Sequence, residues 1–527
     1  MTDHAPTVDE AFRRAIEQFR SRTAVVDGTR SWTFARLGST VSRVAGGLKQ
    51  LGVKPGDRIA IWMPNCFEWV ATFFAALRLG AVVVPVNTAF SVEEASYLVQ
   101  QSGSTVLVAQ SRHRDRNYLQ ESVDLRDSLP HSSLSLVIVG CDSPGGLHSW
   151  DELAASEPME REVAADVTDP TLILYTSGTT GKPKGALHNH GFLEALHSAA
   201  DTLQLTEGDC VVLYLPLYHV YGLLAGMVMT LINGAKVVLM GQFDATRSLE
   251  LMEFEEATLV FGIPTTYLDQ LALPTIDSYD LSKVRVAFTP FPADLCYRVS
   301  RRFGYCLNTY GMTETASVAF LGSPHDPQSI SIESAGYPVA GLQARIVDDE
   351  TGVALSTGEP GELQLRGPSI LTQYYESPDE TALSFTSDGW FRTGDRAHLD
   401  EAGRLHFYGR QKDQLRVGGE MVDPVEIEVV LQGHPAVERA AVVGVADDRL
   451  GQVPYAWVQV RRAHKVIPSE LAEYVAARLA WFKRPRSISI IEHLPTTASG
   501  KVQKFRLIAD IGRPEEQTGG AAQVTSS

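Results

Sequence analysis

The sequence predicts an α/β protein in which a large N-terminal part of layered sheets and helices precedes a small, mobile α+β domain. Apolar, β-branched runs alternate with helix-like segments through the first 400 residues, as expected for helices packed on sheets. A charged, turn-rich passage at residues 395–413 interrupts this alternation, which then resumes. The length of 527 residues also exceeds what one hydrophobic core usually supports.

Each expected element follows from its pattern. Short apolar runs rich in Val and Ile predict strands at residues 58–62, 81–85, 105–109, 135–139 and 171–174. Two intervening segments, 70–79 and 92–101, have helical character. Beyond the turn-rich passage, the pattern predicts strands at 440–445 and 456–460 and a helix at 469–479.

These changes along the chain divide it into three parts. Residues 1–410 are predicted to form the N-terminal domain and residues 411–511 the small domain. The remaining residues, 512–527, end in GGAAQVTSS and are predicted to be a disordered tail.

Composition excludes several classes of function. The net charge of -17 argues against a nucleic-acid-binding protein, which needs a basic face. No apolar run is long enough to span a bilayer, and the N-terminus lacks a signal architecture, so a cytoplasmic protein is expected. The five cysteines show neither disulfide nor zinc spacing. The basic cluster 483–486 suits either a polyphosphate or solvent.

The strongest local motif is residues 175–185 (YTSGTTGKPKG), directly after an apolar strand. Glycines let backbone N–H groups face an anion, hydroxyls add donors, and Lys182 and Lys184 supply charge, so the loop suits a polyphosphate better than a plain surface turn. It is not a Walker A loop, because Gly178 and Gly181 are too close together and Pro183 follows the lysine.

This loop resembles the phosphate-binding signature of the adenylate-forming superfamily, which includes acyl- and aryl-CoA synthetases, luciferases and peptide-synthetase adenylation domains. Further matches follow in order along the chain. They are 216–222 (PLYHVYG), 310–315 (YGMTET), 389–395 (GWFRTGD), 409–413 (GRQKD) with 418–428 (GGEMVDPVEIE), and 494–501 (LPTTASGK).

The resemblance implies an ATP-dependent ligase that joins an acid to AMP, expels pyrophosphate and passes the acyl group to a thiol. It implies an ATP site formed by Thr176, Ser177, Gly178, Thr179, Thr180, Gly181, Lys182, Thr309, Tyr310, Gly311, Met312, Thr313, Asp395 and Arg410. It also implies that Lys184 and Lys501 are catalytic, and that Lys501 reaches the carboxylate and the α-phosphate.

Several of these assignments have a physical rationale and a plainer alternative. Tyr310 would stack on adenine, although it could be a core tyrosine. Asp395 and Arg410 would contact the ribose hydroxyls, although each alone would more often be a surface charge. Glu314, with Thr176, would bind Mg²⁺, because a bare carboxylate beside phosphates repels them; the alternative for Glu314 is a solvated acid.

The C-terminal part would serve the second half-reaction by turning about a hinge. The resemblance places the hinge at Lys412 and a thiol tunnel beside Gly418 and Gly419, where missing side chains would admit a pantetheine arm. A turn or β-bulge explains the two glycines equally well.

The acid pocket is predicted to include His219, Val220, Phe288 and Phe291. The resemblance also gives His219 a catalytic role in the thioester step, although a core histidine is the alternative. Where many relatives carry a small-residue segment, this chain reads AFTPFPAD at 287–294, so a long straight acyl chain is harder to accommodate.

The sequence therefore predicts a ligase that uses ATP, Mg²⁺ and coenzyme A and acts on a compact or aromatic acid. One alternative is a ligase for a very small or inorganic acid such as nitrite, with an amine acceptor. Others are an acyl-AMP ligase with a carrier-protein or other non-coenzyme acceptor, and a degenerate nucleotide-binding protein, which intact Glu314, Asp395, Arg410 and Lys501 disfavour. The sequence leaves the oligomeric state open.

Overall fold

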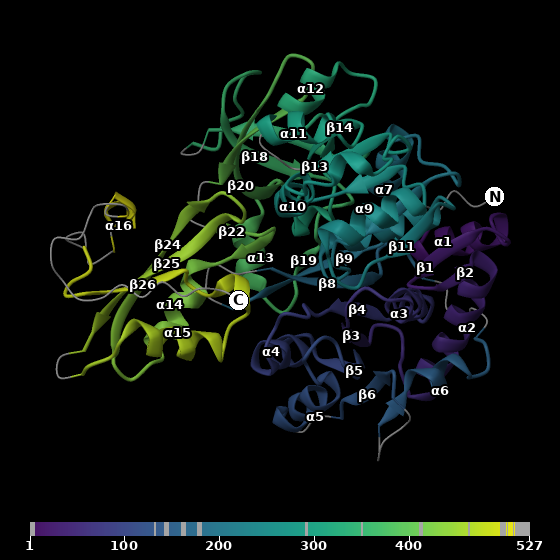
Figure 1. Cartoon of the computed structure of the whole chain (residues 1–527), viewed down its shortest axis with the longest axis horizontal. Helices are drawn as coiled ribbons and strands as arrows, with labels where there is room; N and C mark the ends of the chain where they lie inside the picture. The colour runs from purple at the N-terminus through teal and green to yellow at the C-terminus, as the bar shows by residue number, and fades with distance from the viewer. Residues whose placement is uncertain are drawn as a thin grey trace. The chain divides into compact units, whose positions relative to one another are not determined.

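The computed structural model describes residues 6–130, 133–141, 147–159, 165–176, 182–289, 293–348, 351–410, 415–461, 464–495, 502, 504–509 and 511 (Figure 1). It contains two compact units. The first comprises Met1–Thr88, Ala95–Tyr175 and Gly185–Gly409, and the second comprises Ala89–Glu94, Thr176–Lys184 and Arg410–Ser527.

The first sheet of the first unit is mainly parallel and, within the described residues, has eight strands. Its strands, in spatial order, are β19 (Gln373–Tyr374), β9 (Lys184–Asn189), β8 (Pro170–Thr176), β4 (Val82–Pro85), β3 (Arg58–Trp62), β5 (Ser104–Gln110), β6 (Ser135–Val139) and β7 (His148–Ser149). The chain leaves β3 for β4 on one side and then crosses to β5 on the other, so the strand order reverses at β3.

The second sheet has a parallel centre and, over the residues described, nine strands. In spatial order they are β16 (Tyr337–Pro338), β15 (Phe320–Leu321), β14 (Tyr305–Tyr310), β13 (Val286–Thr289), β12 (Leu259–Phe261), β10 (Cys210–Leu213), β11 (Lys236–Leu239), β1 (Thr23–Asp27) and β2 (Arg30–Thr33).

Within the turn-rich passage, the described residues 395–410 fold largely as strand. A third sheet consists of β17 (Gln343–Val347), β18 (Gly361–Arg366), β20 (Phe391–Leu399) and β21 (Leu405–Arg410). Its charges and glycines belong to the β20–β21 connection, where Gly403 has a φ of +81° and Arg404 Nε lies 2.7 Å from Asp400 Oδ2. The composition change thus marks a hairpin, and the predicted boundary at residue 410 stays a prediction.

The second unit contains a further sheet and its own apolar core. Its strands are β22 (Leu415–Val417), β23 (Glu420–Val422), β24 (Val437–Asp447), β25 (Gly451–Val460) and β26 (Ser487–Ile491). Helices α14 (Pro424–Gln432), α15 (Pro468–Ala476) and α16 (Lys504–Ala509) accompany them. Leu431, Val458 and Leu471 are fully buried in this core.

Helices surround the sheets of the first unit (Figure 1). They are α1 (Val8–Gln18), α2 (Phe34–Gln50), α3 (Phe67–Arg78), α4 (Val92–Ser102), α5 (Tyr118–Ser128), α6 (Trp150–Ala154), α7 (Phe192–Thr202), α8 (Met229–Ile232), α9 (Ala245–Phe254), α10 (Pro264–Leu271), α11 (Ala293–Ser300), α12 (Gln328–Glu333) and α13 (Pro378–Ser384). None of the described helices is both long and apolar enough to cross a bilayer.

The sequence patterns explain where these elements form. Thr7 and Glu10 form a reciprocal capping box at the start of α1. Helix α3 is buried along its whole length, which explains its nearly continuous apolar sequence. The α/β fold class is confirmed, and the strands predicted at 58–62 and 135–139 match β3 and β6 to the residue.

Candidate active site

Tyr310 and Asp395, both predicted to bind ATP, lie together in the first unit. Tyr310 ends β14 and Asp395 lies in β20, and the Tyr310 hydroxyl donates a hydrogen bond to Asp395 Oδ2 over 2.6 Å. Both residues are buried, with 6% and 3% of their surface exposed. The Tyr310 ring also contacts Phe407, at 5.6 Å between centroids. The predicted base-stacking residue thus orients the predicted ribose-binding carboxylate.

The backbone after Tyr310 is tightly constrained. A Cβ at Gly311 would lie 1.5 Å from the carbonyl oxygen of Ser317, so no other residue fits there. Ala316 and Ser317 have φ values of +53° and +90°, a costly conformation for residues with side chains. Thr309 donates a hydrogen bond to the Phe320 carbonyl. Backbone strain of this kind clusters at functional sites.

Glu314 lies in the same turn, in the short 3₁₀ helix η3 (Thr313–Thr315) that follows Met312. Its carboxylate is buried, and Oε1 accepts a hydrogen bond from the Tyr374 hydroxyl over 2.9 Å. The segment just before β19 also holds the turn, because the Leu371 N–H donates to the Glu314 carbonyl. Sequence reasoning missed Tyr374, since a tyrosine 60 residues away in a two-residue strand carries no local signal.

His188 supports this turn from β9. Its Nε2 lies 2.8 Å from the Thr313 carbonyl, to which the ring donates. Burial lowers the pKa of His188 to about 4, although the hydrogen bond to Thr313 acts in the opposite direction. The ring is therefore neutral at pH 7 and places no positive charge beside Glu314.

The chemistry of the Glu314 carboxylate suits Mg²⁺. The described residues contain no cluster of three or more His, Cys, Asp or Glu side chains able to hold a metal. Mg²⁺ in nucleotide sites commonly takes one or two carboxylates and completes its shell with phosphates and water. A single buried carboxylate such as Glu314 fits that mode, and its metal role stays a prediction.

The phosphate loop is described only at its ends. Thr176 ends β8, Lys182 is exposed, and Lys184 begins β9. Ser177, Gly178, Thr179, Thr180 and Gly181 lie outside the described residues.

His219 lies in the loop that follows β10, residues 214–220, which we call the His219 loop, and Asn65 holds the start of this loop. The Asn65 side chain donates to the Leu213 and Leu215 carbonyls and accepts from the Leu217 N–H. Its amide bridges the two large sheets, because Asn65 follows β3 whereas Leu213 ends β10 and residues 214–217 follow it. Asn65 lacks a sequence signal because an Asn after a strand is common in loops.

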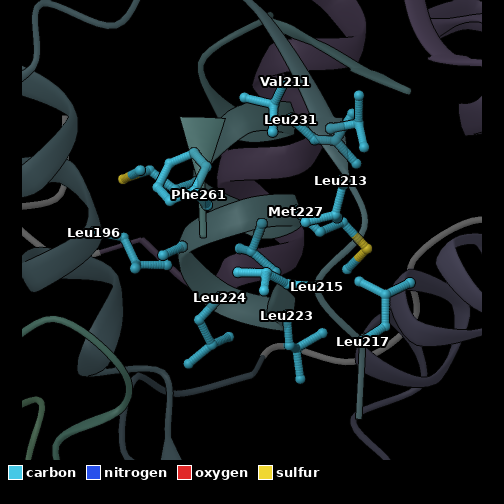
Figure 2. Close-up of a cluster of buried hydrophobic side chains, with 14 of the residues drawn as sticks. Leu196, Val211, Leu213, Leu215, Leu217, Leu223, Leu224, Met227, Leu231 and Phe261 are labelled. Carbon is cyan, nitrogen blue, oxygen red and sulfur yellow. The ribbon is translucent and has the colours of Figure 1, made fainter. Parts of the chain in front are cut away.

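A π-helix, η1 (Tyr221–Val228), begins two residues after His219. Such helices are rare and often occur at functional sites. Leu223, Leu224 and Met227 anchor it in the apolar core, where Leu213, Leu215 and Phe261 surround them (Figure 2). Tyr221 is the first residue of this helix, and Val220, which is predicted to line the acid pocket, immediately precedes it.

Aromatic rings gather beside this loop. Phe288 stacks on its strand partner Phe261, with centroids 4.7 Å apart and planes 6° from parallel, and Tyr221 meets Phe261 edge-on. Tyr267 fixes the strand by donating to the Phe288 carbonyl. Phe291 lies outside the described residues. The bulk of Phe288 is thus part of a packed wall.

The C-terminal residues are described in part. Gly418 and Gly419 have φ values of +59° and +89° and form the two-residue turn between β22 and β23. This geometry matches a type I′ turn, so the hairpin alone explains both glycines, and their tunnel role stays a prediction. Arg410 ends β21, whereas Lys412 and Lys501 lie outside the described residues.

Lys483 has a structural role in place of the polyphosphate contact that its sequence allowed. Only 3% of the residue is exposed, and its ammonium lies 2.8 Å from Glu426 and 3.1 Å from Glu94, all within the second unit. The attraction of the two carboxylates raises the pKa of Lys483 against the opposing effect of burial.

Comparison with protein families and with known proteins identifies the family of this chain. The model of the AMP-binding enzyme family matches residues 12–375, and that of the AMP-binding enzyme C-terminal domain matches residues 426–501. A feruloyl-CoA synthase from an Amycolatopsis species is 36% identical over 488 residues, which cover 92% of this chain and 94% of the relative.

Two further proteins are similar over most of their length. The mitochondrial medium-chain acyl-CoA ligase ACSF2 of Danio rerio is 31% identical over 543 residues, covering 97% of this chain and 89% of the relative. The solved structure of the amide bond synthetase McbA from Marinactinospora thermotolerans has a TM-score of 0.84 at 28% identity, covering 95% of this chain and 99% of that one. This chain belongs to the AMP-binding family of adenylate-forming enzymes and is an AMP-forming, acyl-CoA ligase-like enzyme.

Proposed function

We propose that the enzyme adenylates a compact aromatic acid and transfers the resulting acyl group to coenzyme A. The observation that carries the choice of acid is the buried stack of Phe261 and Phe288, with Tyr221 edge-on, beside the His219 loop. Flat rings favour offset or edge contacts with other rings, so such a wall suits an aryl group better than a long flexible chain. The aryl substrate named for the feruloyl-CoA synthase relative supports the same choice.

The first half-reaction joins the acid to AMP. A carboxylate oxygen attacks the α-phosphorus of ATP, and the bond to the β-phosphate oxygen breaks to release pyrophosphate. Tyr310 would hold the adenine and Asp395 the ribose, since the hydroxyl of one orients the carboxylate of the other. Mg²⁺ held by Glu314 would supply charge neutralisation at the phosphates, and Lys182, Lys184 and Lys501 would add positive charge.

The second half-reaction forms the thioester. The sulfur of coenzyme A attacks the acyl carbonyl, and the carbonyl–phosphate bond breaks to release AMP. His219 would orient the carboxylate in the first step and take the thiol proton in the second, because an imidazole can exchange a proton near neutral pH. We assign residues 411–511 as the mobile domain that serves both steps, with its pivot at Lys412.

The test is a panel of aryl and aliphatic acids, incubated with ATP, Mg²⁺ and either coenzyme A or a primary amine, with products identified by mass. The expected result is an aryl-CoA as the dominant product. A panel in which medium-chain acids react faster than every aryl acid would contradict the proposed acid class.

The aromatic wall can be tested separately. Phe261→Ala is expected to raise KM for the aryl acid and leave KM for ATP unchanged, because it removes a ring contact worth about 1 kcal/mol beyond area burial. Phe12→Ala is a matched control, since Phe12 is also fully buried but stacks on Phe74, away from the wall. Equal effects of both substitutions on KM for the acid would mean that the wall acts only through stability.

An amine acceptor is the second candidate, favoured by the similarity to the amide bond synthetase. An amine would attack the same acyl carbonyl and release AMP, giving an amide. A product mass that corresponds to an amide, with no thioester, would favour it. A very small or inorganic acid such as nitrite, with an amine acceptor, is a further alternative, in which the amine attacks the nitrogen of the adenylated acid, AMP leaves, and the product has an N–N bond rather than an amide.

A further inference from the structure

One glutamine side chain connects the two ends of the phosphate loop, residues 175–185. Gln101 lies in the last turn of α4, and its amide makes one hydrogen bond toward each end of the loop. We propose that Gln101 is a positioning residue for the phosphates of ATP, because it fixes the spacing of the loop ends and, through β19, their position relative to Glu314. The proposal rests on the phosphate-binding role predicted for the loop.

The first hydrogen bond holds the start of the loop. The hydroxyl of Tyr175, near the end of β8, donates to Gln101 Oε1 and lies 3.4 Å from the Leu98 carbonyl, one turn earlier in α4. Burial raises the pKa of Tyr175, so this hydroxyl keeps its proton and remains a donor across the neutral pH range. The side chain at which the loop begins is thus tied to α4.

The second hydrogen bond reaches the end of the loop through Tyr375. Gln101 Nε2 donates to the Tyr375 carbonyl over 3.0 Å, and the Tyr375 N–H donates to the Gly185 carbonyl over 2.7 Å. A carbonyl can only accept, which orients the amide so that its oxygen faces Tyr175. A Cβ on Gly185 would lie 3.3 Å from Cζ of the Tyr175 ring, so the two loop ends also lie against each other. We call this closed set of contacts the Gln101 clamp.

The segment that meets Gln101 also holds the predicted metal ligand. β19 pairs with β9, and β8 lies on the other side of β9 (Figure 1). The Tyr374 hydroxyl donates to Glu314 Oε1 over 2.9 Å, and the Leu371 N–H donates to the Glu314 carbonyl. Residues 371–375 therefore contact Glu314 as well as the end of the phosphate loop.

The Gln101 clamp and Glu314 form one continuous support within the first unit. Glu314, as the predicted Mg²⁺ ligand, and the donors of the loop would act on the same phosphates, so the distance between the loop ends and Glu314 decides how well both can act together. Such spacing matters, because a misplacement of about 1 Å can lower a rate about 100-fold. A glutamine suits this task, because its amide both donates and accepts and adds no charge to the loop.

The test compares the affinities of ATP and AMP, measured by calorimetry with Mg²⁺ and without acid or acceptor. Gln101→Leu keeps a residue that favours a helix and removes both hydrogen bonds. It is expected to raise the Kd for ATP about tenfold or more, because the loop loses its fixed ends. The Kd for AMP should stay at the wild-type value, because AMP lacks the β- and γ-phosphates. A glutamine that only stabilised the fold would change both affinities or neither.

Two further variants make the result specific. Tyr175→Phe removes only the first hydrogen bond and keeps the ring against Gly185. It should raise the Kd for ATP by less than Gln101→Leu does, and it should have no further effect in the double variant, because its partner atom is already gone. Gln100→Leu makes the same change at the neighbouring, exposed position of α4 and should behave as wild type.

The two half-reactions give an independent measurement. With the most reactive acid of the panel described above, pyrophosphate exchange in Gln101→Leu should fall about tenfold or more. Acyl transfer from the corresponding acyl-AMP, supplied directly, should keep the wild-type rate, because pyrophosphate has already left. Equal loss of both activities would contradict a role confined to the phosphates.

Thermal unfolding checks that each variant is folded, and should Gln101→Leu fail to fold, the ratio of the ATP and AMP affinities in Tyr175→Phe decides the proposal. The same Kd for ATP in Gln101→Leu as in wild type, an equal rise for ATP and AMP, or the same change in Gln100→Leu would overturn it.

Lys182→Ala separates such a failure from a failure of the phosphate-binding role. A rise in the Kd for ATP in Lys182→Ala but not in Gln101→Leu would refute only the Gln101 clamp. Wild-type affinity for ATP in both variants would refute the predicted role of the loop as well.

Discussion

The hydroxyl of Tyr310 donates to Oδ2 of Asp395 across 85 residues of sequence, and the two side chains are almost completely buried. A buried carboxylate needs donors, so this hydrogen bond contributes to both the fold and the predicted nucleotide site. The aromatic ring and the carboxylate are therefore a single unit whose two functions can be separated by substitution.

Tyr310→Phe should keep the ring and remove the hydroxyl. We expect the free energy of unfolding to fall by about 1–3 kcal/mol, because Asp395 loses a buried donor. KM for ATP should rise, because Asp395 is no longer oriented toward the ribose. Thermal unfolding and pyrophosphate exchange measure the two effects. The control Tyr297→Phe removes an exposed hydrogen bond to Glu333 and should change neither quantity.

Glu314→Gln should separate charge from shape at the predicted Mg²⁺ ligand. A glutamine oxygen can still accept from Tyr374, so we expect the fold to persist while adenylation falls by about 100-fold or more. The Mg²⁺ concentration needed for half-maximal pyrophosphate exchange should rise. Glu333→Gln changes an exposed carboxylate on α12 and provides the control. An unaltered Mg²⁺ requirement in Glu314→Gln would remove the metal role.

The two half-reactions should respond oppositely to changes in the C-terminal part. Lys501→Ala is expected to abolish adenylate formation and spare thioester formation from supplied acyl-AMP. Lys412→Pro should give the reverse pattern, because proline fixes φ at the predicted pivot. Equal loss of both steps in Lys501→Ala, or full thioester synthesis in Lys412→Pro, would refute these assignments.

Lys483→Met should destabilise the second unit in a pH-dependent way. Glu426 and Glu94 would lose their cation, and breaking a buried pair typically costs about 3–5 kcal/mol. Burial already raises the pKa of Glu426, and loss of Lys483 should raise it further. The folded variant then binds more protons than its unfolded form, so its stability rises as the pH falls.

Denaturant unfolding of wild type and Lys483→Met between pH 8 and pH 5 measures this effect. The difference in free energy of unfolding between wild type and Lys483→Met should narrow toward pH 5, where the carboxyl groups of Glu94 and Glu426 in the variant can accept protons. The exposed Lys465→Met serves as the control and should show no gap. A gap that is constant with pH would indicate lost packing rather than unpaired charge.

Much of the fold follows from local pattern. The fully buried strands β3 and β6 have continuous apolar runs with clear ends, so they were predictable to the residue. Helix α3 begins at Phe67, three residues before the predicted start at residue 70, because burial on all sides removes the periodicity that marks a helix boundary. The composition of passage 395–413 did not reveal the β20–β21 hairpin, since a charged hairpin and an interdomain linker share the same composition.

Long-range contacts carry no such signature. The hydrogen bond from Tyr374 to Glu314 and the Asn65 bridge between sheets depend on tertiary structure alone. The family resemblance supplied Tyr310, Asp395 and Glu314 as site residues, but their mutual geometry came from the structure. Phe288 was predicted as a pocket residue because the segment 287–294 differs from that of many relatives. Its stacking partner Phe261 was not predicted, because it lies in a strand whose apolar sequence indicates only a buried core.

The Asn65 amide has a consequence for redesign. One side chain fixes three alternate positions, Leu213, Leu215 and Leu217, so the stem of the His219 loop cannot shift without breaking contacts to the other sheet. Tyr221 begins the π-helix directly after this stem, whereas Leu223, Leu224 and Met227 are fixed in the core. Libraries that diversify Tyr221 and leave Asn65 and the buried part of the π-helix intact should therefore alter acid preference while retaining the geometry needed for turnover.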